Sequence, residues 1–242
     1  MSLAEGLRRA TAWVAERFEE GLSAVERPTV TRAPDLGTVI DVSQFQGAID
    51  WAAVRASGVE AVWIRAEIGY GTGDGMVEHH AEGARVAGLP FGVYGLCYPR
   101  HGCAQDADRQ ARQLLEHHRQ LGASLLPMID VEDGPPGPPT HAEWAEAIDA
   151  YAVTIEGDLG KAPIVYGSPA FFATMADLLS LHAVDRCPLF VADYRPGPPQ
   201  IPPPFTAYAL HQFTGSGTCP GIAGAVDRSR LAPNVTIDVL RC

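Results

Sequence analysis

The feature that most restricts the fold of this chain is a regular alternation of short apolar segments with longer amphipathic segments from residue 38 onward. The short segments are rich in β-branched and aromatic residues and have the length of strands. The longer segments repeat apolar residues every three to four positions, and several end at a glycine, as helices with one buried face do. The expected strands cover residues 38–42, 61–66, 90–94, 125–132, 162–166, 189–192, 208–213 and 225–227, and the expected helices cover residues 50–57, 76–87, 105–121, 141–159 and 169–181.

The order of these segments predicts a barrel. Strands that alternate with helices along a chain pair in parallel and carry the helices outside the sheet. The connection between the sixth and seventh strands is rich in proline and shows no helical pattern, and the connection to the eighth is short. We therefore predict an α/β fold, a TIM-like (β/α) barrel whose closing strands are irregular and lack full helices.

An additional amphipathic helix is expected before the barrel. Residues 2–25 repeat apolar side chains at helical spacing among charges, and Pro28, Pro34 and Gly37 then interrupt the chain. We therefore divide the chain into an N-terminal helix with its linker, residues 1–37, and a barrel, residues 38–242. The acidic residues of this helix argue against a membrane surface, so it is expected to pack on the barrel or on a partner protein.

The charge and hydropathy of the chain exclude several partners. The chain has 18 Lys and Arg against 29 Asp and Glu, a formal net charge of −11, which makes nucleic acid an unfavourable partner. No segment approaches the roughly 20 apolar residues that span a bilayer. The N-terminus lacks the apolar core of a signal peptide, so we expect synthesis in the cytoplasm.

Cysteine and histidine give no pattern of a metal site. The five cysteines are odd in number and contain no Cys-x-x-Cys pair, so reduced thiols are expected. His79-His80 and His117-His118 fall in helical, charged segments and are expected on solvated faces. The chain also lacks a glycine-rich phosphate loop. We therefore expect no metal and no cofactor.

The fourth expected strand ends in two acids, Asp130 and Glu132. Side chains two residues apart on a strand point to the same face, so the two carboxylates lie together if the strand continues through Glu132. Two close carboxylates resist ionising together, which raises one pKa and suits a general acid beside a carboxylate. The alternative is a core strand that ends in a solvated acidic turn, because Asp133, Gly134 and two prolines follow.

Nearly every expected strand finishes in a polar, acidic or aromatic residue. In a barrel of this type the carboxyl ends of the strands meet in one cleft, which holds the functional residues. Such a cleft would be acidic, with tyrosines available to stack on sugar rings. The residues at these ends are Asp41, Arg65, Glu67, Tyr94, Asp130, Glu132, Tyr166, Asp193, Tyr194, His211, Gln212 and Asp227.

A series of motifs follows the order found in a known family. They are Thr38-Val39-Ile40-Asp41-Val42-Ser43-Gln44-Phe45-Gln46-Gly47 with Ile49-Asp50-Trp51, Met128-Ile129-Asp130-Val131-Glu132, Val165-Tyr166, Leu189-Phe190-Val191-Ala192-Asp193-Tyr194, Gln212-Phe213-Thr214-Gly215-Ser216-Gly217 and Gly224-Ala225-Val226-Asp227. Together, over residues 38–231, they resemble the glycoside hydrolase family 25 lysozymes.

The resemblance implies an N-acetylmuramidase that hydrolyses the β-1,4 bond between N-acetylmuramic acid and N-acetylglucosamine in bacterial peptidoglycan. It also implies that Glu132 is the proton donor and Asp130 its carboxylate partner, with Asp41 and Asp227 as further catalytic acids. The expected substrate-binding residues are Tyr94 and Tyr166, which match aromatic positions of the family, together with Arg65, Glu67, Asp193, Tyr194 and Gln212.

Three positions depart from the family pattern. Arg65-Ala66-Glu67-Ile68-Gly69 stands where many members have Lys-Ala-Thr-Glu-Gly, Gly95 stands where a His often follows the third-strand tyrosine, and His211 replaces the usual Trp. These changes affect the expected sugar subsites, whereas all four acids are present.

Hydrolysis is expected to retain the anomeric configuration, because neighbouring acids suit the carboxyl separation of about 5 Å in retaining enzymes. The nucleophile is either Asp130 or, as in the family, the acetamido group of the substrate. Two other functions stay open: a non-catalytic glycan-binding module on a hydrolase fold, and a metal-dependent phosphodiester hydrolase with Asp130 and Glu132 as ligands. An enzyme of this kind without a signal peptide would act on the wall after release, as a phage lysin does, or as part of a virion.

Overall fold

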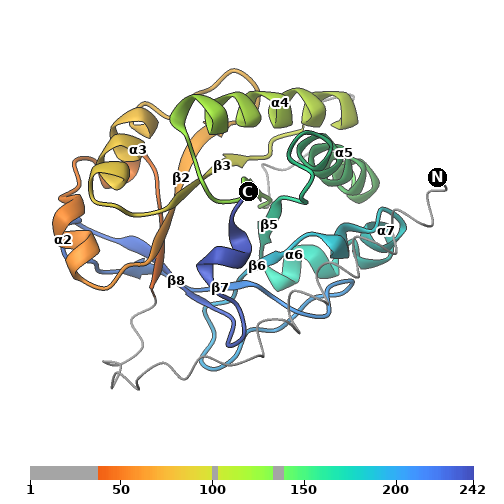
Figure 1. Cartoon of the computed structure of the whole chain (residues 1–242). Coiled ribbons are helices and arrows are strands. Elements are labelled where there is room, and N and C mark those ends of the chain that lie inside the picture. Colours follow the sequence, from red (N-terminus) through yellow and green to blue (C-terminus); the bar gives the residue numbers. More distant parts are fainter. Residues whose placement is uncertain (1–37, 100–102, 133–138) are drawn as a thin grey trace.

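The structure is a computed structural model that describes residues 38–99, 103–132 and 139–242. Its centre is a closed barrel of eight strands whose neighbours follow the order of the chain (Figure 1). The predicted TIM-like barrel is therefore confirmed. The helix expected over residues 2–25 lies outside the described residues.

The elements agree with the expected alternation to within a few residues. None of the helices in the described ranges combines the length and apolar character needed to cross a membrane. The strands are β1 (Val39–Val42), β2 (Ala61–Ile68), β3 (Phe91–Leu96), β4 (Met128–Asp130), β5 (Ile164–Gly167), β6 (Leu189–Ala192), β7 (Leu210–Gly217) and β8 (Val226–Leu231). The helices are α2 (Trp51–Ala56), α3 (Val77–Val86), α4 (Cys103–Leu121), α5 (His141–Leu159), α6 (Pro169–Ala173) and α7 (Ala176–Leu181), with single 3-10 turns η1 (Gln44–Gln46), η2 (Val184–Arg186) and η3 (Ile237–Leu240).

The single helix expected over residues 169–181 is wrong, because the structure has two short helices, α6 and α7. The Thr174 hydroxyl donates to the carbonyl oxygen of Phe171 at 2.7 Å, and the Thr174 backbone N–H donates to the same oxygen at 3.2 Å. These bonds to the third preceding residue tighten the turn and end α6. The apolar spacing predicted helical segments but carried no signal for this break.

The closing strands differ in direction from the rest of the barrel. The pairs from β1–β2 through β6–β7 are parallel, whereas β8 is antiparallel to both β7 and β1. Within residues 139–242 no helix lies between β6 and β8, so the chain turns back directly from β7. The parallel pairing inferred from the alternation therefore holds for seven strands and fails for β8. As a consequence, the first residues of β8 lie at the same end of the barrel as the last residues of β1.

The apolar core has two layers. Side chains that fill the barrel form the inner layer, including Trp63, Met128, Phe190 and Leu210. The outer layer lies between the strands and the helices around them (Figure 1). Trp63 is fully buried, and its indole N–H donates to the carbonyl oxygen of Leu126 at 3.0 Å, so its one polar atom has a partner inside the core.

Two histidines that were expected on solvated faces are buried. His80 lies on the inner side of α3, with Nε2 3.2 Å from the carbonyl oxygen of Ser43 and its ring edge-on to Trp51. His118 on α4 is also buried. The expectation was wrong because an imidazole with a hydrogen-bond partner packs in a core as an aromatic ring.

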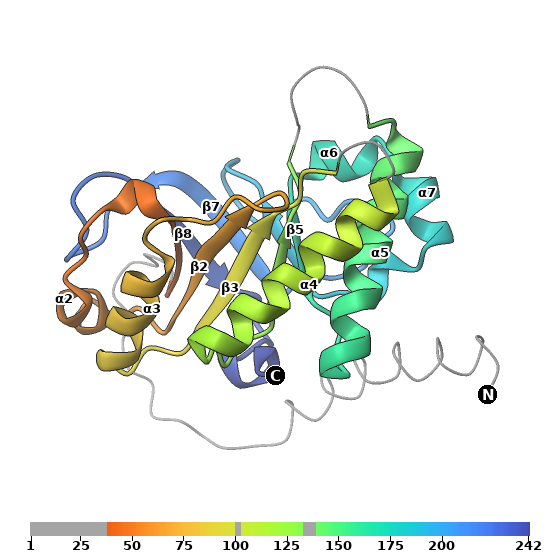
Figure 2. The same ribbon diagram turned by 90° about the horizontal axis from the view of Figure 1, so that it is seen from above.

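Helices α4 and α5 lie side by side on the outside of the barrel (Figure 2). The Thr154 hydroxyl on α5 donates to Asp108 on α4 at 2.7 Å, and Arg119 forms an ion pair with Asp158 across the same interface. A capping box of Thr140 with Glu143 fixes the start of α5. This pair of helices covers the side of the barrel that carries β3 and β4.

Replacing Gly92 by alanine should destabilise the protein, because the barrel interior has no room for the added methyl group. A Cβ at Gly92 would lie 2.4 Å from Nε1 of the fully buried Trp63. We expect the free energy of unfolding to fall by roughly 1–3 kcal/mol, the usual cost of overpacking. Chemical denaturation measures this change.

The matched control is Gly157→Ala in an exposed part of α5, where nothing lies within 4 Å of the added methyl group. Alanine is favoured over glycine in a helix by about 1 kcal/mol, so this variant should be slightly more stable than the wild type. A Gly92→Ala variant as stable as Gly157→Ala would contradict the packing around Trp63.

Candidate active site

Asp41 on β1 and Asp227 on β8 form the centre of the candidate site. The antiparallel register pairs these two residues directly, and their carboxyl groups are hydrogen-bonded to each other. Burial, followed by the charge of Asp227, raises the pKa of Asp41 well above its usual value, and burial also raises the pKa of Asp227. A hydrogen bond between two carboxyl groups needs a proton, so we infer that the pair shares one.

Gln212 on β7 connects this acid pair to two tyrosines. Its side-chain amide donates to Oδ2 of Asp41 at 3.0 Å, and its Oε1 accepts from the hydroxyls of Tyr166 at 2.8 Å and Tyr194 at 2.7 Å. These three bonds fix which end of the amide faces Asp41. The structure therefore brings four of the predicted residues, Asp41, Gln212, Tyr166 and Tyr194, into one hydrogen-bonded network.

Asp130 is the last residue of β4, between Leu96 of β3 and Tyr166 of β5. Burial, then the charges of Glu132 and Asp41, raise the pKa of Asp130 well above its usual value, and the nearby Arg65 opposes this rise. Its Oδ1 is buried and has no hydrogen-bond partner among the described residues. An unsatisfied buried acceptor of this kind favours a ligand that brings a donor.

Glu132 lies beyond the end of β4, so the expectation that the strand continues through Glu132 is wrong. It nevertheless lies close to the acid cluster, because its charge raises the pKa of Asp130, after burial, and contributes to the raised pKa of Asp41. Glu132 is exposed, whereas Asp41 and Asp130 are buried. The four predicted acids therefore gather at one end of the barrel. Glu132 is more accessible to solvent than its neighbour Asp130.

Tyr94 and Tyr166 line the same end of the barrel and are both buried. Burial, followed by the charges of Asp41 and Asp130, raises the pKa of each tyrosine well above its usual value. Both phenol groups therefore stay protonated, and the Tyr166 hydroxyl uses its proton in the hydrogen bond to Gln212.

Arg65 on β2 pairs in register with Tyr94 and supplies a positive charge beside the acids. Its Nε donates to Oδ2 of Asp74 at 2.9 Å in a buried ion pair. Sequence reasoning did not identify Asp74, because Asp74 stands in a loop far from any expected strand end. Only the fold shows that this loop returns to β2.

The structure places Glu67 outside the cleft, away from the other predicted site residues. The register shifts between Arg65 and Glu67, which pairs Glu67 with Gly95 and turns it toward the helices. There the carboxylate accepts from the hydroxyl of Tyr151 on α5 at 3.3 Å and from the side-chain amide of Gln113 on α4. Burial raises the pKa of Glu67 to about 8, although these two hydrogen bonds lower it. The strand bulge accounts for the difference from the expected position.

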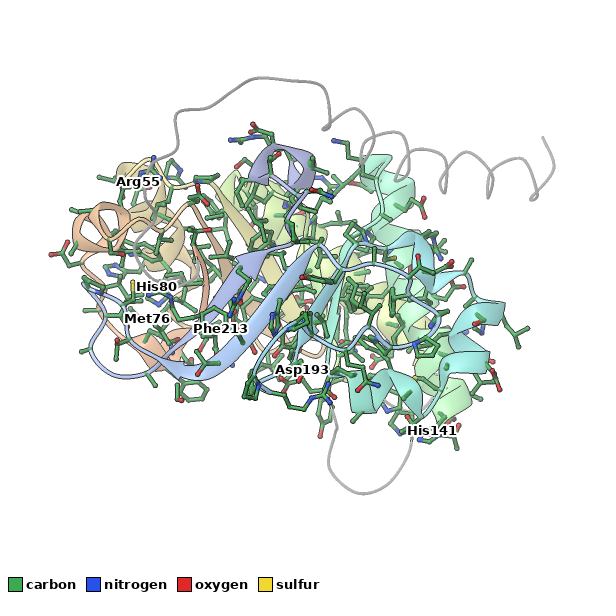
Figure 3. All side chains as sticks on the ribbon, turned by 90° about the horizontal axis from the view of Figure 1, so that it is seen from below. Arg55, Met76, His80, His141, Asp193 and Phe213 are labelled. Carbon is green, nitrogen blue, oxygen red and sulfur yellow. The ribbon has the colours of Figure 1, made fainter. Side chains whose placement is uncertain are left out.

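Asp193, labelled in Figure 3, is also held apart from the four acids. Its carboxylate accepts from the Arg195 guanidinium at 2.9 and 2.6 Å and from the backbone N–H of Gln200 at 2.9 Å. The hydrogen bonds of Arg195 lower the pKa of Asp193 despite its burial. His211 donates from Nε2 to the carbonyl oxygen of Asp193 at 2.7 Å. Asp193 thus fixes the connection after β6, next to Tyr194, which does reach the network.

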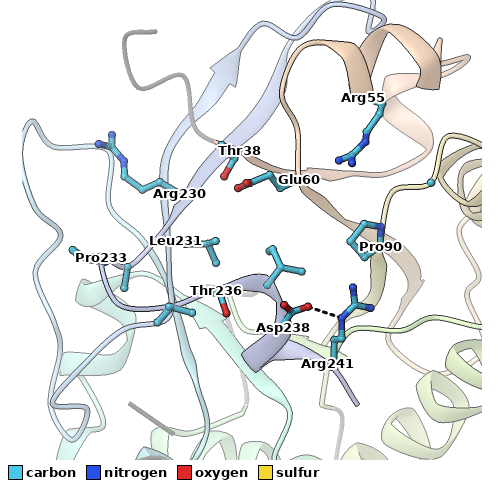
Figure 4. Close-up of a pocket in the computed structure, with 14 residues that line it drawn as sticks. Thr38, Arg55, Glu60, Pro90, Arg230, Leu231, Pro233, Thr236, Asp238 and Arg241 are labelled. Atoms are coloured by element: carbon cyan, nitrogen blue, oxygen red, sulfur yellow. Dashed lines mark hydrogen bonds and ion pairs between the residues drawn. The ribbon is translucent and has the colours of Figure 1, made fainter. Parts of the chain in front are cut away.

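A pocket of about 580 Å³ lies at the other end of the barrel (Figure 4). Its lining includes Thr38, Glu60 and Pro90, which precede β1, β2 and β3, so it opens where the parallel strands begin. Figure 3 shows Arg55, which lines this pocket, and Asp193 at opposite ends of the barrel. None of the predicted site residues lines this pocket.

The described residues hold no group of three or more His, Cys, Asp and Glu side chains arranged to bind a metal ion. A barrel with facing carboxyl groups at one end matches the class of glycoside hydrolases that work by acid and carboxylate catalysis.

Comparison with known proteins identifies the family. The model of Glycosyl hydrolases family 25 matches residues 40–222, most of the chain. This chain therefore belongs to glycosyl hydrolases family 25, and the resemblance seen in its motifs is confirmed. It is a glycoside hydrolase.

Two lysozymes are similar in sequence. Lysozyme M1 of Streptomyces globisporus is 26% identical over 225 residues, which cover 90% of this chain and 76% of the relative. The autolytic lysozyme of Clostridium acetobutylicum is 28% identical over 204 residues, covering 82% of this chain and 56% of the relative.

Solved structures share the fold. The catalytic domain of endolysin ply40 from bacteriophage P40 of Listeria monocytogenes superposes with a TM-score of 0.70 at 25% identity, covering 86% of this chain and 98% of that chain. The Clostridium perfringens spore cortex lytic enzyme SleM gives a TM-score of 0.72 at 24% identity, covering 87% of this chain and 71% of that chain.

Replacing Glu67 by glutamine should make stability less dependent on pH. The pKa of Glu67 is raised from 4.5 to about 8 in the folded protein. Between these two pKa values the folded chain keeps a proton that the unfolded chain releases. The stabilisation from this proton is therefore fully present below pH 4.5 and is lost as the pH rises to about 8. Melting temperatures from pH 4.5 to 9 should fall less for Glu67→Gln than for the wild type. Glu82→Gln changes an exposed residue on α3, and its melting temperature should depend on pH as that of the wild type does. If the melting temperature of Glu67→Gln also followed the wild-type pH dependence, Glu67 would not be the titrating group.

Proposed function

We propose that this chain hydrolyses the β-1,4 bond between N-acetylmuramic acid and N-acetylglucosamine in bacterial peptidoglycan. The observation that carries the proposal is the group of four acids, Asp41, Asp130, Glu132 and Asp227, at one end of a family 25 barrel. The similarity to two lysozymes supports the same substrate. The presence of all four acids argues against the alternative of a non-catalytic glycan-binding module on a hydrolase fold.

Glu132 is proposed as the general acid that protonates the glycosidic oxygen as the bond breaks. Glu132 is exposed at the end of the barrel that carries the acids, where a long glycan strand has access. Its charge raises the pKa of Asp130 and of Asp41. Because neighbouring carboxylates resist full ionisation, the cluster retains protons at a pH at which an isolated glutamate has lost its own. A retained proton is what the leaving group needs.

Asp130 is proposed to stabilise the positive charge that develops at the anomeric carbon. Its buried Oδ1, which has no partner among the described residues, suits an acetamido N–H of the substrate. In that arrangement Asp130 orients the acetamido oxygen for attack on the anomeric carbon; alternatively, Asp130 attacks directly. In both routes a second displacement by water follows, so the configuration is retained.

The Asp41–Asp227 pair and its network are proposed to hold the reacting sugar. The shared proton lowers the negative charge of the pair, and the amide of Gln212 donates a hydrogen bond to it. The protonated Tyr94 supplies a donor at the wall of the site, whereas the hydroxyl of Tyr166 donates to Gln212 and helps to fix its amide. Rigid donors and acceptors position a sugar without reorganising during the reaction.

We propose the cell wall as the place of action. The wall is where the proposed substrate is found, and one of the similar structures is the catalytic domain of a phage endolysin. Synthesis in the cytoplasm followed by release, as a lysin or within a virion, stays a prediction.

Glu132→Gln should lower turnover on peptidoglycan by roughly 10²–10⁴-fold, because glutamine keeps the size of the side chain but cannot deliver a proton. Release of reducing ends measures the rate, and circular dichroism shows whether the variant is folded. Glu82→Gln, a charge removal on the exposed side of α3, is the matched control and should keep wild-type turnover. A folded Glu132→Gln variant with near wild-type turnover would show that Glu132 is not the general acid.

Loss of the wild-type turnover in EDTA would support the alternative of a metal-dependent phosphodiester hydrolase.

The first product released should be the β-anomer of the new reducing sugar, because both proposed routes involve two displacements. Proton NMR of a short peptidoglycan fragment, recorded within the first turnovers, distinguishes the anomers before they interconvert. An initial α-anomer would mean a single displacement by water and would exclude both roles proposed for Asp130 while leaving the acid role of Glu132 intact.

A further inference from the structure

Phe45 is a large apolar side chain left in solvent at the end of the barrel that carries the four acids. It is the middle residue of η1, which follows β1 and Asp41 directly. Its side chain is 77% exposed. An exposed aromatic ring next to a binding site is a common contact for a ligand, since burying it releases ordered water.

The backbone that carries Phe45 is fixed on both sides. Ser43 and Gln46 form a capping box around the turn. On one side, the backbone N–H of Gln44 donates to Oδ2 of Asp74 at 3.0 Å. On the other, the side-chain amide of Gln46 donates to the carbonyl oxygen of Ala225 at 3.2 Å. The exposed ring therefore stands on a rigid support, which lowers the entropy cost of binding to it.

The orientation of the ring is set by Arg65. The Arg65 guanidinium carbon lies over the Phe45 ring, 5.0 Å from its centre, in a cation–π arrangement. Arg65 is itself held by the buried ion pair with Asp74, the same residue that binds the η1 backbone. One face of the ring is thus covered by a fixed cation, and the large exposed fraction leaves the opposite face open.

Arg65 also connects this ring to the chemistry. The charge of Arg65 acts on both Asp130 and Tyr94, opposing the rise that burial causes in the pKa of each. Phe45 is therefore connected to the acid cluster through one side chain, that of Arg65, and lies at the same end of the barrel.

The geometry points to the open face of Phe45 as a stacking subsite for a pyranose ring of the glycan strand, one or more sugars away from the cleaved bond. The inference rests on the proposed function and adds a binding site to it. The C–H groups on one face of a pyranose are apolar and slightly positive, and the face of an aromatic ring is slightly negative. The residues on either side of Phe45 are polar, as in a sugar site, whereas a protein partner would need a larger apolar patch.

The test uses steady-state kinetics on glycan strands from which the stem peptides have been removed. Phe45→Ala should raise KM roughly ten-fold with little change in kcat, because the lost contact is uniform binding away from the reacting atoms. Phe45→Trp should keep a low KM, since it preserves the aromatic face, whereas Phe45→Leu should resemble Phe45→Ala. Val86→Ala, a change at a 79% exposed apolar residue on α3, is the control and should leave both constants unchanged.

An unchanged KM in Phe45→Ala, or equal KM values for Phe45→Trp and Phe45→Leu, would overturn the subsite. An effect seen only on strands that keep their peptides would also overturn it, because the ring would then contact the peptide. If the wild type cleaves neither kind of strand, the proposed function fails instead. Calorimetric binding of peptide-free strands to the wild type and to Phe45→Ala then decides the subsite, with weaker binding by Phe45→Ala expected and equal binding contradicting it.

Discussion

The candidate site depends on keeping several carboxyl groups buried close together without their mutual repulsion opening the barrel. An ionised carboxylate taken out of water costs several kcal/mol unless charge or hydrogen bonds compensate it. Two arrangements provide this compensation. Asp41 and Asp227 are hydrogen-bonded to each other, for which we infer a shared proton, and Arg65 supplies a positive charge beside Asp130. In the proposed reaction the cluster starts with protons already bound, which acid-assisted cleavage of a glycosidic bond requires.

The direction of the last strand makes this arrangement possible. Asp227 is the second residue of β8, so in a parallel barrel it would lie at the end opposite to Asp41. Because β8 runs antiparallel to β1, Asp227 is instead opposite Asp41 in the register. Gln212 of β7 then completes the group by donating to Asp41. The irregular closing strands are thus part of the site as well as of the fold.

Much of this could be predicted from the sequence, because it follows from local patterns. Alternating segments predicted the barrel, and polar residues at strand ends predicted a cleft with Asp41, Asp130 and Tyr166. Features that depend on register or on distant loops could not be predicted. One shift in β2 turns Glu67 toward Tyr151, and the ion pair of Asp74 with Arg65 joins a loop to a strand that sequence spacing does not relate. For the same reason, the sequence did not predict the contacts of Asp74 and Arg65 that hold Phe45 in place.

The central claim is that this chain is a muramidase, and the most direct measurement is the chemical identity of the reducing ends that it creates. Purified peptidoglycan would be digested, reduced with borohydride and analysed by mass spectrometry, with Glu132→Gln as the inactive reference. We predict that every new reduced end derives from N-acetylmuramic acid. The rate at which these ends form should fall when the Glu132 carboxyl group is removed. New ends formed by N-acetylglucosamine, or no new ends from the folded wild-type protein, would contradict the account.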